Sequence, residues 1–160
     1  MSPPPYTALS FADDTRITMK VRQPEDYKRL QEDLNVIYKW ADTNNMMFNA
    51  SKFEHLRYGA VPSTNQEYYK TSNGSEIKTE ASVRDLGVTM SNQGGFSEHI
   101  DCIALRAKRL SGWIMRTFMT RKKLDIFTLY MALVLPIMEY CCQLWSPLAI
   151  GQVRKLETVQ

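Results

Sequence analysis

Two adjacent aspartates, Asp13 and Asp14, are the residues of this 160-residue chain whose type and spacing most directly suggest chemistry. They lie between two short apolar runs, residues 6–11 and 16–21, which predict a β-hairpin with the carboxylates at its tip. Neighbouring carboxylates repel each other, and a divalent cation such as Mg²⁺ removes that repulsion. Such a site serves two-metal phosphoryl transfer, in which ions about 3.5–4 Å apart stabilise the attacking and leaving oxygens. A plain turn is the alternative, because aspartate is also a favoured turn residue.

A long helix and further short strands are expected to support this hairpin. Pro24 followed by two acidic residues marks a helix start, and apolar residues then recur at helical spacing until about Asn44. The strands expected beyond this helix cover residues 46–49, 55–58 and 84–90. The last of them is broken at Gly87, and Asn73-Gly74 predicts a hairpin turn.

The chain from residue 95 onward is expected to be helical. Apolar stripes at helical spacing cover residues 96–114 and 126–137, and residues 152–160 predict one more helix. The most apolar stretch, residues 126–150, contains Pro136 and lacks about 18 uninterrupted apolar residues, so we expect a buried helix and not a membrane span. The aromatic and thiol side chains expected in this core are Trp113, Trp145, Cys141 and Cys142.

The composition favours a folded intracellular protein. Hydrophobic residues make up 44% and charged residues 23%, so the chain can bury a core and does not have the composition of a disordered segment. Three cysteines, two of them adjacent, make a poor disulfide framework and predict a reducing compartment. The net charge is only +3, yet residues 96–123 carry seven Lys or Arg against two acids. This segment is either a contact for a phosphate-rich ligand or a solvated helix face.

Six motifs occur in an order typical of one protein family. Residues Leu9-Ser-Phe-Ala-Asp-Asp-Thr15 resemble the F/Y-x-D-D motif of reverse transcriptases, in the F-A-D-D-T form common in non-LTR (LINE-type) retrotransposons. The other matches are Leu30-Gln-Glu-Asp-Leu34 with Trp40, Met47-Phe-Asn-Ala-Ser-Lys52, Arg84-Asp-Leu-Gly-Val88, Phe96-Ser-Glu-His-Ile100, and Glu139-Tyr-Cys141 with Trp145-Ser-Pro147. The chain therefore resembles the C-terminal palm and thumb portion of such an enzyme.

This resemblance implies an α+β fold, in which a partial ferredoxin-like palm (β-hairpin, helix, strand and extra hairpin) precedes an α-helical thumb. The expected domains are residues 1–92, the C-terminal half of the palm with a primer-grip-like hairpin, and residues 93–160, a thumb-like region truncated at its C-terminus. The family's palm takes a further catalytic aspartate from an upstream strand, and the ten residues before Phe11 leave no room for that strand or for the fingers. We therefore expect the isolated chain to be inactive, and its unpaired strand edges to make it marginally stable.

The resemblance also implies roles for individual residues. Asp13 and Asp14 would be catalytic and would bind Mg²⁺ (or Mn²⁺) in a parent RNA-directed DNA polymerase that acts on an RNA template and a DNA primer. Lys52 would lie near the incoming nucleoside triphosphate, although a surface lysine after a strand gives the same pattern. Leu86 and Gly87 would hold the primer end, unless Gly87 is only a strand bend. The thumb residues that would contact the nucleic-acid backbone are Arg106, Lys108, Arg109 and Arg116.

Two other functions are compatible with the sequence. A non-enzymatic nucleic-acid-binding or assembly module would bind in a salt-sensitive way that does not depend on Asp13. A phospho-receiver domain would use the aspartate pair as an acidic pocket, but a later strand ending in a phosphoacceptor aspartate is lacking. If the chain is part of a reverse transcriptase, its expected partner is the N-terminal palm and fingers portion. Its expected location is then the cytoplasm or nucleus, and no membrane association is expected.

Overall fold

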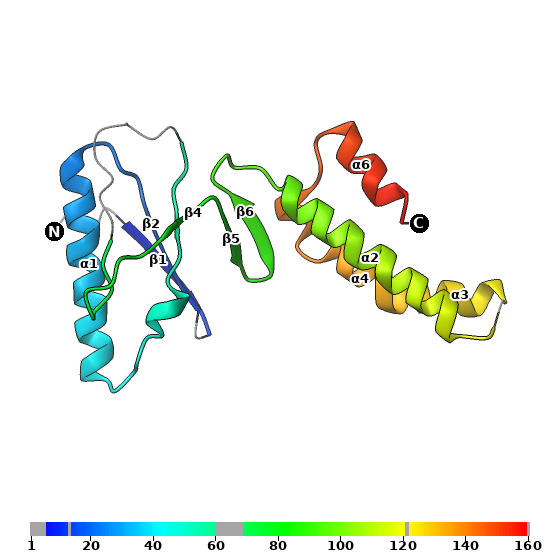
Figure 1. Ribbon diagram of the computed structural model, residues 1–160, viewed down its shortest axis with the longest axis horizontal. Helices are drawn as coiled ribbons and strands as arrows, with labels where there is room; N and C mark the ends of the chain where they lie inside the picture. The colour runs from blue at the N-terminus through cyan, green and yellow to red at the C-terminus, as the bar shows by residue number, and fades with distance from the viewer. Residues whose placement is uncertain (1–5, 13, 60–68, 121, 160) are drawn as a thin grey trace. The chain divides into compact units, whose positions relative to one another are not determined.

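The computed structural model describes residues 6–12, 14–59, 69–120 and 122–159, and it combines helices with small two-stranded sheets (Figure 1). An α+β composition is therefore confirmed. The chain divides into two compact units, residues 1–55 with 61–79 and residues 56–60 with 80–160. The hairpin formed by residues 82–91 belongs to the same unit as the C-terminal helices, whereas the predicted domain boundary after residue 92 remains a prediction.

The predicted N-terminal hairpin is present. Strand β1 (Tyr6–Phe11) pairs antiparallel with β2 (Asp14–Met19), and Phe11 lies opposite Asp14 in the register. The loop is therefore two residues long, and Ala12 adopts a φ of 53°, as tight hairpin turns require. The second strand begins at Asp14, two residues before the predicted start.

Helix α1 (Pro24–Thr43) also follows the prediction. Its N-terminus is stabilised by the Asp26 carboxylate, which accepts hydrogen bonds from the backbone N–H groups of Arg22 (2.8 Å) and Gln23 (2.9 Å). These two bonds lower the pKa of Asp26, because they stabilise its charged form. The helix ends at Asn44, and the next residue, Asn45, takes a left-handed conformation that asparagine tolerates.

The first unit has a small core of its own. One face of α1 supplies Leu34 and Tyr38, which cluster with Tyr69 and Ile77 from the returning chain. The Gln31 side chain fixes that return, because it accepts a hydrogen bond from the N–H of Lys70 (2.7 Å) and donates one to the Lys70 carbonyl (3.1 Å). The predicted turn at Asn73-Gly74 is confirmed, with Thr71 N–H bonded to the Ser75 carbonyl at 2.8 Å.

Of two strands predicted in the middle of the chain, the one at residues 46–49 was wrong and the one at residues 55–58 is present only in part. Residues 46–49 form no strand, and a short 3-10 helix, η1 (Ala50–Lys52), follows them. The Asn49 side chain accepts a hydrogen bond from the Ser51 N–H (3.0 Å) and so favours a turn over an extended chain. Strand β3 covers only His55–Leu56 and pairs with β4 (Thr79–Glu80).

The strand predicted at residues 84–90, with a break at Gly87, is divided into the two strands of a tight hairpin, in keeping with the extra hairpin that the resemblance implies. Strand β5 (Ser82–Asp85) pairs antiparallel with β6 (Val88–Ser91), and Leu86 and Gly87 form the two-residue loop. Both loop residues have positive φ, 45° and 86°, which is the geometry that matches the right-handed twist of the strands. Gly87, which was predicted to break the strand, lies in the turn that reverses the direction of the chain.

Helices make up the rest of the second unit, and the predicted helix at 96–114 is confirmed as α2 (Ser97–Thr117). A continuous helical run follows as α3 (Lys123–Leu129), the π-helix η2 (Tyr130–Val134) and α4 (Leu135–Glu139). Pro136 lacks an N–H donor and its ring crowds the preceding turn, which explains the widened π-turn just before it.

The expectation of one buried helix through residues 126–150 was wrong. The chain turns at Cys141, whose φ is 53°, before α5 (Cys142–Trp145) and α6 (Ile150–Glu157). Within the described residues, no helix is long and apolar enough to span a membrane.

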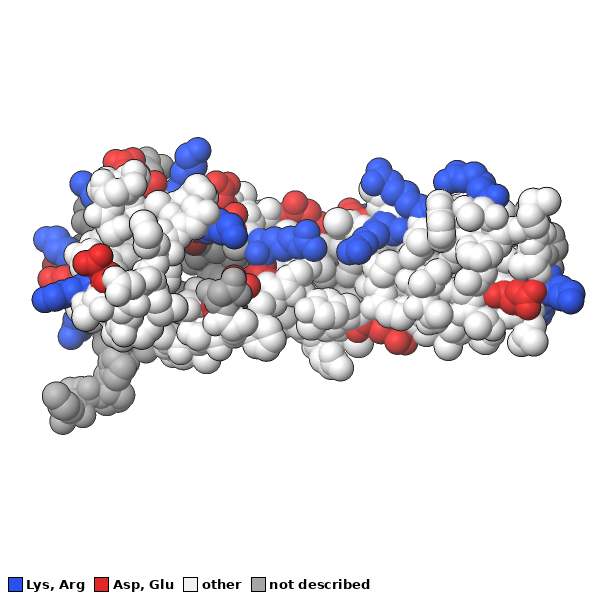
Figure 2. All heavy atoms as spheres, turned by 90° about the horizontal axis from the view of Figure 1, so that it is seen from below, with Lys and Arg blue, Asp and Glu red and all other residues white. Residues whose placement is uncertain are grey.

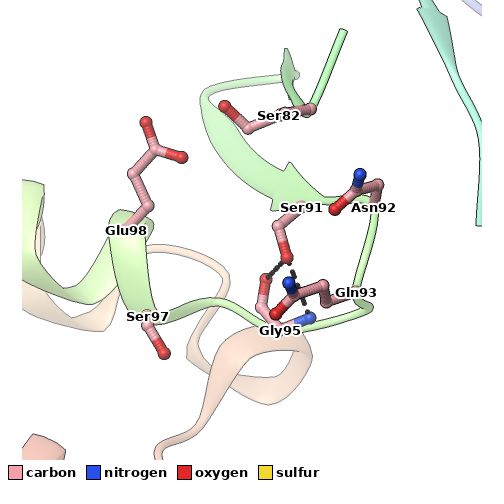
Figure 3. A pocket seen from close by; sticks show the side chains of 8 residues that line it. Ser82, Ser91, Asn92, Gln93, Gly95, Ser97 and Glu98 are labelled. Atoms are coloured by element: carbon pink, nitrogen blue, oxygen red, sulfur yellow. Dashed lines mark hydrogen bonds between the residues drawn. The ribbon is translucent and has the colours of Figure 1, made fainter.

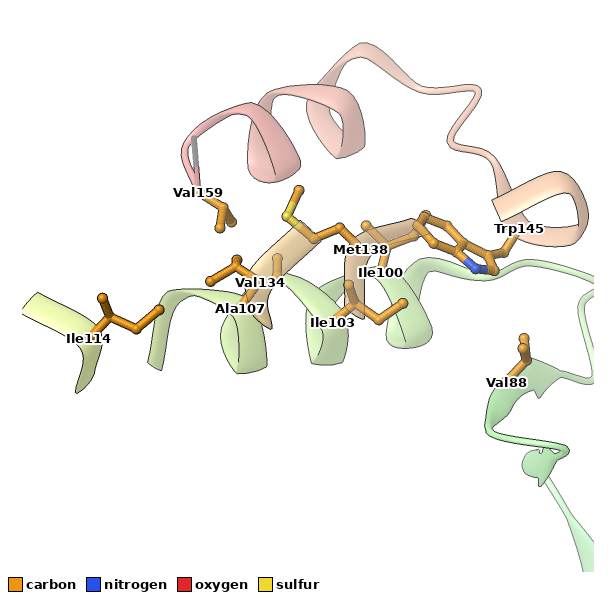
Figure 4. Close-up of a cluster of buried hydrophobic side chains, with 10 residues drawn as sticks. Val88, Ile100, Ile103, Ala107, Ile114, Val134, Met138, Trp145 and Val159 are labelled. Carbon is orange, nitrogen blue, oxygen red and sulfur yellow. The ribbon is translucent and has the colours of Figure 1, made fainter. Parts of the chain in front are cut away.

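The core of the second unit lies between α2, α4 and α6, and one residue of the β5–β6 hairpin joins it (Figure 4). Val88 is the contribution of the hairpin, and it is 2% exposed. The other fully packed members are Ile100, Ile103, Ala104, Ala107, Ile114, Val134, Met138, Trp145 and Val159. The hairpin is thus attached to the helices by apolar packing as well as by the chain.

Candidate functional site

The tip of the β1–β2 hairpin presents Asp14 to solvent. In the pleated hairpin, Leu9, Phe11, Asp14 and Arg16 lie on one face, because directly opposed residues share a face. Leu9 and Phe11 are 61% and 69% exposed, so this face carries apolar surface beside the carboxylate. The other predicted carboxylate, Asp13, lies outside the described residues.

The chemistry of this tip fits a hard cation. Carboxylate oxygens are the ligands that Mg²⁺ prefers, and Mg²⁺ is commonly held by one or two carboxylates together with substrate phosphates. Among the described residues, no group of three or more His, Cys, Asp or Glu side chains is placed to hold a metal ion. A cation at Asp14 would therefore depend on ligands beyond the described side chains.

Lys52 lies at the end of η1 with its side chain exposed. Its segment is anchored by three aromatic rings, since Phe48 and Phe53 contact each other and both contact Tyr38 of α1, at centroid distances of 5.6–6.1 Å. Within the described chain, no hydrogen bond or ion pair joins Lys52 to Asp14. The role of Lys52 at a nucleotide thus remains a prediction.

The Leu86–Gly87 loop is in contact with the end of α4. The hydroxyl of Tyr140 donates a hydrogen bond to the carbonyl of Leu86 at 3.0 Å, and its ring lies against Gly87. A hydrogen bond with Cys141 raises the pKa of the Tyr140 hydroxyl, which favours its protonated, donating form. Sequence reasoning placed Tyr140 in a family motif and assigned it no partner, because Tyr140 lies 54 positions after Leu86 and the sequence does not reveal a contact over that separation.

The predicted basic residues of α2 are all exposed. Arg109 and Arg116 define an arginine face opposite the buried stripe of α2, whereas Arg106 and Lys108 flank that stripe on its two sides. On the side drawn in Figure 2, Lys and Arg side chains lie among Asp and Glu side chains and uncharged surface, and they do not form one continuous basic patch. Exposure suits a backbone contact and a solvated face equally, so their role remains a prediction.

Trp113 is a candidate that the sequence reasoning missed. It was expected in the core, but it is 46% exposed and lies on the arginine face of α2, four residues after Arg109 and three before Arg116. Its indole contacts Phe118 edge to face, at 6.0 Å and 89°. The helical period could have predicted this exposure, because residue 113 falls on the arginine side of the helical wheel. Cys141 is exposed as well, whereas Trp145 is buried as expected.

His99 and Trp145 connect the β5–β6 hairpin to the helices. The Nδ1 atom of His99 accepts a hydrogen bond from the N–H of Thr89 in β6 at 3.2 Å, and its ring packs against Trp145 at 5.5 Å. Burial, with a further contribution from Arg84, lowers the pKa of His99. The imidazole is therefore favoured in its neutral form, which the accepting Nδ1 requires.

A hollow of about 320 Å³ lies at the opposite end of this hairpin, beside the start of α2 (Figure 3). Three serines, Ser82, Ser91 and Ser97, are among the residues that line it. The Ser91 hydroxyl is already bonded to the Gly95 carbonyl at 3.1 Å, and the charged residue of the lining is Glu98. A carboxylate there disfavours an anion such as phosphate.

An acidic hairpin tip and an exposed arginine face, in an α+β chain, together define a candidate for nucleic-acid chemistry. The chain is similar to the RNA-directed DNA polymerase from mobile element jockey of Drosophila melanogaster, with 28% identity over 163 aligned positions that cover 94% of this chain. This similarity confirms the predicted resemblance to reverse transcriptases of non-LTR retrotransposons.

The aligned region spans 17% of the length of that relative. No family model matches the chain. No solved structure matches it either.

Proposed function

We propose that this chain is a segment of a reverse transcriptase of the non-LTR retrotransposon type, which in its parent enzyme takes part in RNA-templated DNA synthesis. The observation that carries this proposal is the similarity to a mobile-element RNA-directed DNA polymerase along 94% of the chain, together with the order of its motifs. The first unit would be the C-terminal part of a palm, and the helices of the second unit would be thumb-like.

The proposed roles follow the predicted residues. Asp13 and Asp14 would hold Mg²⁺ or Mn²⁺, and the bound metal would supply charge stabilisation for nucleotidyl transfer. Lys52 would face the incoming nucleotide, and Leu86 with Gly87 would contact the primer end. An N-terminal palm and fingers portion would complete the site. The parent enzyme would act in the cytoplasm or nucleus, where such elements are copied.

The decisive experiment is Mg²⁺- and Mn²⁺-dependent primer extension on an RNA template. It compares the chain alone, the chain mixed with the jockey-type N-terminal palm and fingers, and the same mixture with Asp13→Asn and Asp14→Asn. We expect extension only in the complemented mixture, and its loss in the double variant, because both carboxylates would be metal ligands.

Extension by the chain alone would contradict the expected inactivity of the isolated segment, if the double variant abolishes it. Complementation that survives Asp13→Asn with Asp14→Asn would reject the proposed metal site. Circular dichroism of each variant serves as the control, because a loss of helix would explain inactivity without any catalytic role.

The second candidate is a nucleic-acid-binding module without catalysis, and the arginine face of α2 with Trp113 favours it. Exposed tryptophan can stack on bases, while nearby arginines neutralise phosphates. This function predicts RNA binding that weakens steeply with salt, falls with Trp113→Ala, and is unchanged by Asp13→Asn. Met115→Ala, a change at an exposed apolar position of α2 that lies off the arginine face, is the matched control.

A further inference from the structure

The loop of the second hairpin has an unfavourable backbone conformation that needs support. Leu86 has a φ of 45°, a region that residues with a Cβ adopt at a cost, and Gly87 has a φ of 86°. Leu86 is also 46% exposed, so burial of its own side chain contributes little to holding this geometry. Contacts from elsewhere in the unit must therefore contribute to fixing the loop.

Tyr140 supplies two such contacts. Its hydroxyl donates to the Leu86 carbonyl at 3.0 Å, and a Cβ built at Gly87 would lie 3.4 Å from its Cε1 atom. The ring thus fits against a backbone position that carries no side chain. Together the two contacts restrain the carbonyl direction of Leu86 and the position of Gly87.

Tyr140 is itself held by the core. The Trp145 indole N–H donates to the Tyr140 carbonyl at 2.7 Å, and the Trp145 side chain is 2% exposed. Trp145 is also connected to the hairpin, because its ring packs on His99. The Nδ1 atom of His99 accepts a hydrogen bond from the N–H of Thr89. These contacts connect the loop, through residues at the end of α4, in α5 and in α2, back to strand β6 of the same hairpin.

We propose that Tyr140 is a positioning residue for the Leu86–Gly87 loop, and that Trp145 and His99 fix Tyr140 against the hairpin. This inference rests on the proposed function where it assigns the loop to the primer end. Through Tyr140, the helices of the second unit then set the orientation in which the Leu86–Gly87 loop faces the recessed 3′ end of a nucleic acid.

The test compares Tyr140→Phe with Tyr58→Phe. Each change removes one hydroxyl from an exposed tyrosine that contacts the same hairpin, since Tyr58 is 51% exposed and its hydroxyl lies 3.8 Å from the Met90 sulfur in β6. Tyr58 does not contact the loop through that bond, so it controls for loss of a tyrosine hydroxyl. Both variants keep the aromatic ring and are expected to fold.

Two readouts are measured in the full chain. Backbone order parameters and the carbonyl chemical shift of Leu86, from NMR, report on the loop itself. Affinities for an RNA–DNA hybrid with a recessed DNA 3′ end and for a blunt hybrid of equal length report on end recognition. We expect Tyr140→Phe to loosen the loop and to reduce the preference for the recessed end about two- to tenfold, as loss of one hydrogen bond predicts.

The outcomes separate the positioning role from the proposed function. Loosening and lost end preference in Tyr140→Phe alone would support both. An unchanged loop in Tyr140→Phe, or equal effects of the two variants, would overturn the positioning role. A loop that loosens in Tyr140→Phe, in a protein whose wild-type form does not distinguish recessed from blunt ends, would support positioning and reject the primer-end function.

Discussion

At the scale of single residues, the buried hydroxyl of Tyr38 offers a prediction with a clear sign. Tyr38 is 8% exposed, its hydroxyl has no hydrogen-bond partner among the residues that the structure describes, and burial raises its pKa. A buried polar group without a partner costs free energy, so Tyr38→Phe should increase the free energy of unfolding by about 0.5–1 kcal/mol. Urea denaturation measures the difference. Tyr58→Phe, at an exposed position, should leave stability unchanged.

A decrease in stability on Tyr38→Phe would contradict this prediction and would indicate that an ordered water satisfies the hydroxyl. The aromatic contacts of the ring with Phe48 and Phe53 persist in the variant, so their loss cannot account for a decrease.

At the scale of residues, the sequence predicted which side chains are exposed better than it predicted which side chains contact each other. The exposed positions of Asp14 and of the α2 arginines followed from turn chemistry and helical period. The contacts of Tyr140 with Leu86 and of His99 with Thr89 did not follow, because each joins different elements. Trp113 was misassigned because its apolar character was given more weight than its position on the helix.

At the scale of elements, the docking of the β5–β6 hairpin on α2 should depend on pH. The His99 Nδ1 atom must be unprotonated to accept from Thr89, and burial and Arg84 hold its pKa below the ordinary value of 6.5. The unfolded chain therefore binds a proton first as the pH falls. Stability should be fully present above about pH 6.5 and decline below it, by at most about 1.4 kcal/mol per pH unit.

Chemical denaturation between pH 5 and pH 8 tests this dependence. His99→Gln keeps an acceptor atom and cannot titrate, so its stability should vary less over the interval than that of the wild type. A pH dependence that His99→Gln leaves intact would assign the effect to another group. His55→Gln, in the first unit, should retain the wild-type slope in the unfolding of the second unit.

Sequence pattern predicted the long elements and missed the local geometry between them. The apolar periods of α1 and α2 are long enough to outweigh chance, so these helices were recovered. The break predicted at Gly87 is the loop of a hairpin, but the part of Leu86 in that loop was missed, because leucine has no turn preference and its left-handed conformation is accompanied by a distant contact with Tyr140. The helix end at Cys141 carries no glycine or asparagine signal either.

At the scale of the whole molecule, two separate cores predict two separable responses to core mutations. Leu34 belongs to the core of the first unit and Ile100 to that of the second, and they are 8% and 1% exposed. Each truncation to alanine removes buried apolar atoms and should cost about 2–5 kcal/mol within its own unit. Amide hydrogen exchange, read for α1 and α2 in the same sample, measures the two responses independently.

Leu34→Ala should accelerate exchange in α1 while leaving α2 protected, and Ile100→Ala should do the reverse. Val36→Ala and Leu105→Ala are matched controls, because they shorten exposed side chains of the same two helices. Acceleration of both helices by either core variant would mean that the units unfold as one, and the boundary between their cores would then not separate folding units. If each core variant accelerates exchange only in its own unit, the β1–β2 hairpin and the contacts of Tyr140 with the Leu86–Gly87 loop have separate stabilities. A variant in one unit would then leave the other unit folded, so that the function of the other unit could still be measured.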